Sequence, residues 1–243
     1  LSALTDGTTY TIAVDVDDAV GNSATQDTGD TFVYDVTAPT ITRTAAEVSN
    51  GDTSNDGTLA LTFTTSEATS DFVSGGISVS GGTLSDFAST SDTVYTATFA
   101  PSADGDTTVD VAAGGFTDSG GNNNAATSQF TWTYDGTGPT VAITTSESDP
   151  ATESTFDVTI TFGEATTTFA SGDITVGGGS VSSFSSTTST VYVATITPSA
   201  DGTVTVDVAA GVATDAYGNE NSAATQFSIE SDQADAPSIT STE

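Results

Sequence analysis

One acidic loop pattern, Asp-x-x-Gly-Asn, occurs three times in the chain, at residues 18–22, 118–122 and 215–219. Such a loop has two explanations. The Asp side chain caps its own turn, while Gly and Asn tolerate positive φ. Alternatively, the carboxylate and nearby carbonyl oxygens bind a cation such as calcium. The pattern alone favours the turn, and repetition does not decide the matter because duplicated domains also duplicate their turns.

The composition excludes most kinds of catalytic and metal site. The 243 residues include 33 Asp and Glu, a single basic residue, Arg43, and neither His nor Cys, which gives a net charge of -32. Ser-His pairs, Cys nucleophiles, His-bound zinc and Schiff-base lysines are therefore absent. Carboxylate chemistry remains. The charge repels nucleic acid and anionic membrane surfaces and attracts cations.

The chain contains an internal sequence repeat. Glu67 and Glu164, Asp118 and Asp215, and Phe130 and Phe227 are all 97 residues apart, and the segments PSADG and VDVAAG recur. Such a period predicts tandem copies of one domain. The loop SNGDTSNDG has no counterpart in the second copy, and we expect it to be solvated.

The Pro-Thr pairs at Pro39 and Pro139 place the boundaries of the repeats. We predict full repeats over 38–137 and 138–233. Residues 1–37 match only the last two strands of a repeat, and residues 234–243 match only the start of one. The chain is therefore expected to be a segment of a longer tandem array.

Alternating apolar and polar residues predict strands within each repeat. In FDVTITF, residues 156–162, four apolar side chains face one way and Asp157, Thr159 and Thr161 face the other. Similar runs recur between Gly, Asp and Ser turns. The pattern predicts an all-β fold of tandem immunoglobulin-like β-sandwiches with about seven strands each. We expect Trp132, the only Trp, to pack in the core or on a sheet face.

The sequence resembles the bacterial immunoglobulin-like repeats of large surface adhesins. The resemblance rests on TAPT and TGPT at the repeat starts, SEAT and GEAT after the second strand, PSADG, and the DxxGN loop. It covers nearly the whole chain, and LTDGTTYTIAV also resembles fibronectin type III. It implies a secreted or cell-surface stalk stiffened by calcium between domains. The last junction departs from the pattern, because SDQADAPS replaces YDGTGPT.

The sandwich topology predicts which carboxylates meet. The first strand starts at the pole where the second strand ends, and the loop before the last strand lies at that pole. Two sets of three carboxylates should therefore approach one another, with Asp18 left from a preceding set. The sets are Asp35, Glu67 and Asp118, and Asp135, Glu164 and Asp215. Oxygen ligands with several charges favour Ca²⁺ over magnesium or a transition metal.

These features favour a structural spacer without enzymatic activity, in an adhesin stalk or filament outside the cell or at its surface. Its partners would be neighbouring repeats and other copies in a filament, with strand addition as one way to complete residues 1–37. A carbohydrate- or protein-binding adhesion module is the alternative, with Tyr217 as the best loop aromatic and a glycan or host-surface ligand. A carboxylate glycosidase is disfavoured, since the acids lie at poles and on solvent faces.

Overall fold

The computed structural model describes residues 3–14, 16–23 and 29–233. The chain divides into two compact units, residues 1–135 and 136–243. The described residues form β-strands and two short 3-10 turns, Ser74–Gly76 and Ser171–Asp173. No helix in this described part has the length and hydropathy needed to cross a membrane. The repeat start predicted at 234–243 lies outside the described residues.

The first unit begins with a hairpin. Strand β1 (Thr8–Thr11) pairs with β2 (Thr31–Tyr34) in antiparallel register, with Thr8 opposite Tyr34. These are the two strands predicted within residues 1–37.

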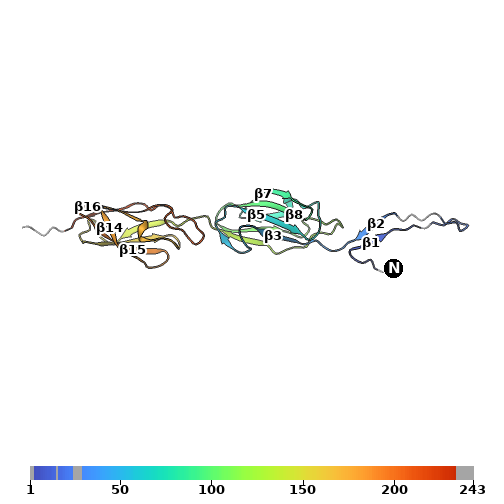
Figure 1. Cartoon of the computed structure of the whole chain (residues 1–243), viewed down its shortest axis with the longest axis horizontal. Coiled ribbons are helices and arrows are strands. Elements are labelled where there is room, and N and C mark those ends of the chain that lie inside the picture. The colour runs from blue at the N-terminus through green and yellow to red at the C-terminus, as the bar shows by residue number, and fades with distance from the viewer. Residues whose placement is uncertain (1–2, 15, 24–28, 234–243) are drawn as a thin grey trace, which may run out of the picture. The chain divides into compact units, whose positions relative to one another are not determined.

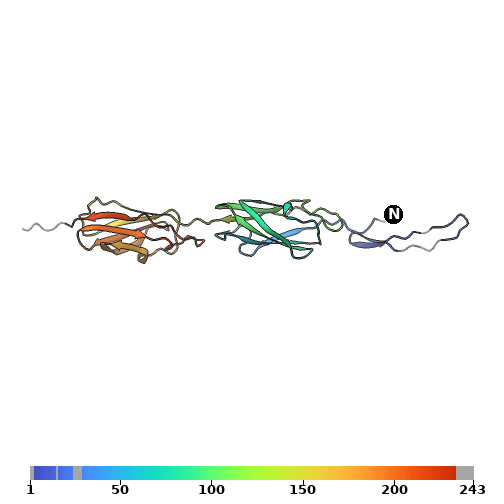
Figure 2. The ribbon, with the colours of Figure 1, turned by 90° about the horizontal axis from the view of Figure 1, so that it is seen from above.

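A two-layered sandwich follows the hairpin (Figure 1). One sheet has the order β3-β5-β8-β7 and the other the order β4-β10-β9-β6. The strands are β3 (Ile41–Ala45), β4 (Thr53–Ser54), β5 (Leu59–Thr65), β6 (Ile77–Ser80), β7 (Gly82–Ser89), β8 (Val94–Pro101), β9 (Gly105–Val111) and β10 (Phe130–Tyr134). The two layers can be followed in the turned view of Figure 2.

The second unit repeats this architecture. Its sheets have the orders β11-β12-β15-β14 and β13-β16-β17. A parallel bridge between Ala151 and Ser231 takes the place of β4. The strands are β11 (Val141–Thr145), β12 (Phe156–Phe162), β13 (Ile174–Gly177), β14 (Gly179–Ser186), β15 (Val191–Pro198), β16 (Gly202–Val208) and β17 (Phe227–Ser231). The predicted all-β class, with sandwiches of about seven strands, is confirmed.

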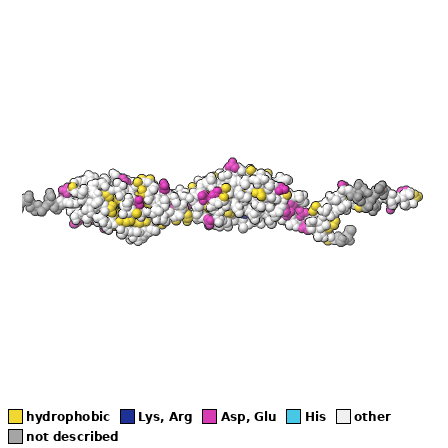
Figure 3. All heavy atoms as spheres, viewed as in Figure 1, with side chains coloured by type: hydrophobic (Ala, Val, Ile, Leu, Met, Phe, Trp, Pro, Cys, Tyr) yellow, Lys and Arg dark blue, Asp and Glu magenta, His cyan; other side chains and the backbone are white. Residues whose placement is uncertain are grey.

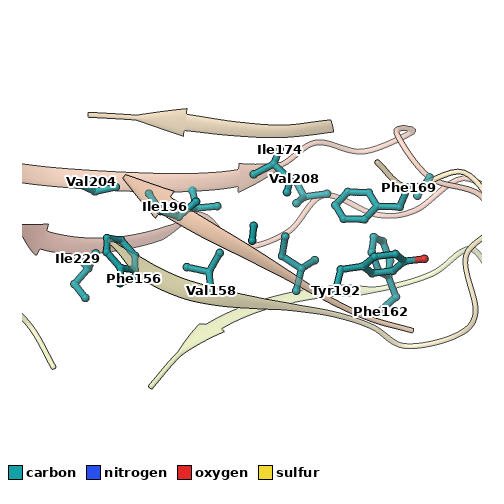
Figure 4. Close-up of a cluster of buried hydrophobic side chains, with 14 of the residues drawn as sticks. Phe156, Val158, Phe162, Phe169, Ile174, Tyr192, Ile196, Val204, Val208 and Ile229 are labelled. Atoms are coloured by element: carbon teal, nitrogen blue, oxygen red, sulfur yellow. The ribbon is translucent and has the colours of Figure 1, made fainter. Parts of the chain in front are cut away.

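Alternation along the strands builds each core. Phe156, Val158 and Ile160 on β12 are at most 2% exposed, whereas Asp157 between them faces solvent. Figure 4 shows side chains of both layers of the second unit pointing toward one another, with Phe169 and Tyr192 at one end. Full burial of each such side chain contributes about 1.5 to 3 kcal/mol. In the first unit Trp132 is 1% exposed and its Nε1 donates to Ser54 Oγ, so it packs in the core.

Two features differ from the sequence interpretation. Strands β7 and β14, GTLSDFAS and GSVSSFSS, carry no alternation that predicts a strand, and their pairing with β8 and β15 overrides their low propensity. The loop SNGDTSNDG is not merely solvated, because it contains β4, which pairs in parallel with β10. The backbone N–H of Gly51 donates to the Thr131 carbonyl, and that of Thr133 donates to the Asp52 carbonyl.

Candidate cation site

The start of β3 and the end of β5 hold two of the predicted carboxylates close together. Ile41 lies opposite Thr65 in the antiparallel pair. Just beyond it, the N–H of Ser66 donates to the Thr40 carbonyl at 2.9 Å, and the N–H of Thr40 donates to Ser66 Oγ at 2.9 Å. The segment that contains Asp35 is thereby fixed beside the loop that contains Glu67.

The long loop between β9 and β10 brings the third carboxylate to the same place. Its backbone is tied to the segment before β3, since the N–H of Ala125 donates to the Pro39 carbonyl at 3.0 Å. Within the loop, Thr117 and Asn123 form an antiparallel bridge, with Asp118 directly after Thr117. The amide Nδ2 of Asn122 donates to the Asp35 carbonyl at 3.1 Å.

The structure brings the predicted side chains together in two groups. Asp35, Glu67 and Asp118 each offer a carboxylate oxygen, and these oxygens lie within 4.8 Å of one another. Asp135, Glu164 and Asp215 form a second group that meets the same limit. In each group the loop aspartate is buried and the other two residues are half-buried.

The turn explanation of the DxxGN loops is correct in structural terms. In the second loop the N–H of Asn122 donates to Asp118 Oδ1 at 2.9 Å, its Nδ2 donates to Oδ2 at 3.0 Å, and Gly121 has a φ of 85°. The other two loops have the same bonds to Asp18 and Asp215. Each carboxylate oxygen has more than one lone pair, so these bonds leave it able to bind a cation as well.

Two carboxylates of the first group, Glu67 and Asp118, have shifted pKa values with different causes. Burial raises the pKa of Glu67, and the negative charges of Asp35, Asp118 and Asp6 raise it further. Burial also raises the pKa of Asp118, but the hydrogen bonds from Asn122 and from the glycine backbone outweigh it, so that pKa lies below its usual value. The loop aspartate Asp118 is thus held ionised, whereas ionisation of Glu67 is disfavoured.

Repulsion within the group favours a bound cation. Two ionised carboxylates about 4.8 Å apart repel by roughly 1 kcal/mol in water and roughly 3.5 kcal/mol at an effective dielectric of about 20. The only basic side chain, Arg43, is used elsewhere, since its Nη1 lies 3.6 Å from Asp110 Oδ1. Figure 3 shows acidic side chains on the visible faces of both units.

The sequence interpretation missed a fourth carboxylate near the first group. Asp6, just before β1, accepts the N–H of Val36 at 2.8 Å on Oδ1 and the hydroxyl of Thr37 on Oδ2. It thereby fixes the residues next to Asp35. The signal in the sequence was the Asp-Gly pair that also precedes β9 and β16, at Asp104 and Asp201.

A buried asparagine that supports each loop was also missed. Asn124 is 2% exposed, accepts the N–H of Phe116 and donates to the carbonyls of Ala112 and Ala125. Asn221 takes the same place in the second unit. The available signal in the sequence was the Asn six residues beyond the loop Asp, in the pattern Gly-Asn-x-Asn.

The DxxGN loops of the two units differ most at their third position. Gly120 packs closely, because a Cβ built there would lie 3.1 Å from Asp35 Cβ and 3.2 Å from Asp118 Oδ1. The second loop has Tyr217 at the equivalent position, and that side chain is 42% exposed.

Residues 35–134 and 135–231 each match the bacterial Ig-like domain family, so the chain belongs to that family. The predicted family is confirmed. The two copies account for most of the chain, and each contains one of the two carboxylate groups. No curated protein matches the sequence.

Solved structures of low sequence identity resemble the fold. InvD of Yersinia pseudotuberculosis is 17% identical over 84% of this chain and 60% of that chain, with a TM-score of 0.36. Invasin, a bacterial integrin-binding protein, is 18% identical over 86% of this chain and 43% of that chain, with a TM-score of 0.48. This chain thus spans less than two thirds of either protein chain.

Proposed function

We propose that this chain is a structural spacer in an extracellular or cell-surface protein, in which consecutive Ig-like repeats form a stalk or filament. The observation that carries the proposal is the repetition of one three-carboxylate group in both family copies. The matched repeats and the kinship to bacterial Ig-like domains support it. Neighbouring repeats are the proposed partners, and no enzymatic activity is assigned.

Calcium is the proposed ligand of the two groups. Each group offers three carboxylates, and backbone carbonyls and waters would complete the six to eight oxygen ligands that Ca²⁺ takes. Magnesium needs a near-ideal octahedron, and transition metals prefer the nitrogen and sulfur ligands that the chain lacks. Extracellular modules of this kind bind with dissociation constants of about 0.1 to 1 mM.

Bound calcium would restrict the segment that joins one repeat to the next. Asp35 comes directly after β2, and Asp135 comes directly after β10, whereas the other ligands follow later in the chain. A cation would therefore fasten the residues after one last strand to the loops of the following sandwich. With free calcium about tenfold above the dissociation constant, each site adds roughly 1.4 kcal/mol of stability.

Thermal unfolding with and without calcium tests the proposal. Trp132 is the only Trp of the chain and lies in the first unit, so its fluorescence reports the unfolding of that unit. Millimolar calcium should raise its midpoint by about 5 to 10 °C over chelator. Asp118→Asn should abolish this rise, whereas the control Asp92→Asn, an exposed carboxylate outside both groups, should preserve it.

Small-angle scattering adds a second readout, because the chelated chain should show a broader distribution of dimensions than the calcium-loaded chain. Identical scattering profiles together with an unchanged midpoint would contradict calcium binding, while leaving the spacer role standing.

An adhesion module that binds a glycan or a protein is the second candidate. Tyr217 supports it, since its ring is exposed in a loop, where aromatic side chains often contact ligands. Tyr217→Ala should then reduce attachment to glycan arrays or host cells without lowering the unfolding midpoint. Unchanged attachment would exclude this residue from any binding role.

A further inference from the structure

Most of the exposed large apolar side chains in the described part of the chain lie in or next to the β1–β2 hairpin. Among the described residues, ten large hydrophobic residues are exposed, and eight of them lie between residues 4 and 36. The eight are Leu4, Ile12, Val14, Val16, Val20, Phe32, Val33 and Val36. Such a concentration marks a surface that another element covers.

The register of the hairpin identifies which part of a repeat it is. Tyr10 lies opposite Phe32, two residues before Tyr34. In the first sandwich Thr107 lies opposite Trp132, two residues before Tyr134. The bridge Asp17–Ser23 likewise matches the bridge Thr117–Asn123. The hairpin therefore corresponds to β9 and β10 with their connecting loop.

Positions equivalent to the apolar residues of the hairpin are buried in the complete repeat. Phe32 is 42% exposed, whereas Trp132 is 1% exposed. Alternate residues share one strand face, so Ile12 and Val14 correspond to Val109 and Val111. The exposed fractions are 50% and 54% in the hairpin but 2% and 0% in the sandwich. We call Tyr10, Ile12, Val14 and Phe32 the hairpin face.

The sandwich shows what covers this face. Strand β9 pairs with β6, strand β10 pairs with β4, and the sheet β3-β5-β8-β7 forms the opposite layer. All of these strands come before β9 in the chain. The hairpin face carries no charge, and the rings of Tyr10 and Phe32 stack with centroids 5.7 Å apart, so the surface is preformed for apolar contact.

We propose that the hairpin face is a docking surface for strands of this same repeat type, equivalent to residues 38–103, that stand ahead of the hairpin in the polypeptide. Docking pairs both free edges of the hairpin and buries the hairpin face against the opposite sheet. A second copy of the hairpin would cover the face but would offer no strand equivalent to β4 or β6.

An extended chain tests this inference. A second copy of residues 38–103 is placed directly ahead of Thr5 of the full chain, and amide hydrogen exchange is compared in the two proteins. In the unextended chain, residues 8–14 and 29–34 should exchange rapidly and the protein should sediment as a monomer. In the extended chain their protection should rise at least about 100-fold, toward that of β9 and β10.

Two substitutions in the extended chain make the test specific. Ile12→Asp places a charge on the hairpin face and should abolish the protection. Thr11→Asp places the same charge on the opposite side of the strand and should preserve it. Equal effects of the two substitutions would overturn the proposal.

A third variant of the extended chain tests whether the added strands fail to dock only because the hairpin side chains differ from those of β9 and β10. Tyr10→Thr with Phe32→Trp gives the hairpin the side chains of β9 and β10 at those positions. Protection of this variant alone, without protection of the natural hairpin, would mean that the natural face fits another partner. A dimer of the unextended chain with a protected hairpin would overturn the proposal in favour of a second copy.

Discussion

At the residue scale, the DxxGN loop combines a turn with a candidate ligand. Asn122 donates to both oxygens of Asp118, which fixes the carboxylate and keeps it ionised, while Glu67 and Asp35 approach it from other segments. Turn formation and cation binding are therefore compatible uses of one side chain. The asparagine orients the carboxylate, so its substitution should disturb the site without removing a proposed ligand.

Glu67 gives the first prediction, a pH dependence. Because its pKa is raised in the folded chain, its contribution to stability is present below its ordinary pKa and is lost as the pH rises through the raised value. In chelator, Glu67→Gln should match the parent near pH 4 and exceed its unfolding midpoint by a few degrees at pH 7. Trp132 fluorescence gives the midpoint.

The control for this prediction is Asp92→Asn, which neutralises an exposed carboxylate of the first unit outside the carboxylate group and should leave the midpoint unchanged at both pH values. With millimolar calcium the order should invert, because Glu67 is a proposed ligand. A parent protein more stable than Glu67→Gln at pH 7 in chelator would contradict the role of repulsion.

At the element scale, a partly buried ion pair joins the two sheets of the first unit. Arg43 on β3 has a side chain only 5% exposed, lies 3.6 Å from Asp110 of β9, and donates to Thr127 Oγ1 and the Ser128 carbonyl. The second unit has Ile143 in place of the arginine, and Gln226 donates to Asp207 at 3.1 Å instead. The equivalent aspartates Asp110 and Asp207 are thus paired with an arginine in one unit and with a glutamine in the other.

Arg43→Ile should therefore destabilise the first unit by about 1 to 3 kcal/mol, because it leaves Thr127 Oγ1 and the Ser128 carbonyl without their donor and Asp110 without its counter-charge. Urea unfolding followed by Trp132 fluorescence measures the loss. The double variant Arg43→Ile with Asp110→Asn should recover part of it. Equal stability of the parent and Arg43→Ile would show that the pair adds nothing.

The elements also show how far the sequence predicts this fold. The apolar alternation of FDVTITF and the 97-residue repeat were enough to predict strands, sandwiches and the meeting of Glu67 with Asp118. Strands β7 and β14 were not predicted, because neither has a regular alternation of apolar and polar residues, and pairing with β8 and β15 makes them strands. Asp6 was missed because its partners, Val36 and Thr37, lie about 30 residues away along the chain.

At the scale of the whole molecule, the charge of -32 governs stability in different salts. Self-repulsion of so many carboxylates destabilises a compact chain, and salt screens it as the Debye length falls from about 30 Å at 0.01 M to about 8 Å at 0.15 M. Calcium at a specific site should instead act at millimolar concentration and then saturate.

The corresponding prediction concerns the chelated chain. Raising NaCl from about 0.01 to 0.5 M should increase its calorimetric unfolding midpoint by several degrees, and choline chloride should act equally because screening does not depend on the cation. A midpoint independent of salt would show that the acidic residues are too widely spaced for their repulsion to matter.

The parallel pairing of β4 with β10 affects how the repeat resists force when the protein is pulled from both ends. Tension draws the end of β10 one way and the start of the sandwich the other, so the two strands tend to slide along each other. The bonds from Gly51 to Thr131, from Thr133 to Asp52 and from Asp135 to Ser54 then bear the load together. A repeat built in this way yields by shearing several bonds at once, which is a mechanical strength that equilibrium stability does not measure.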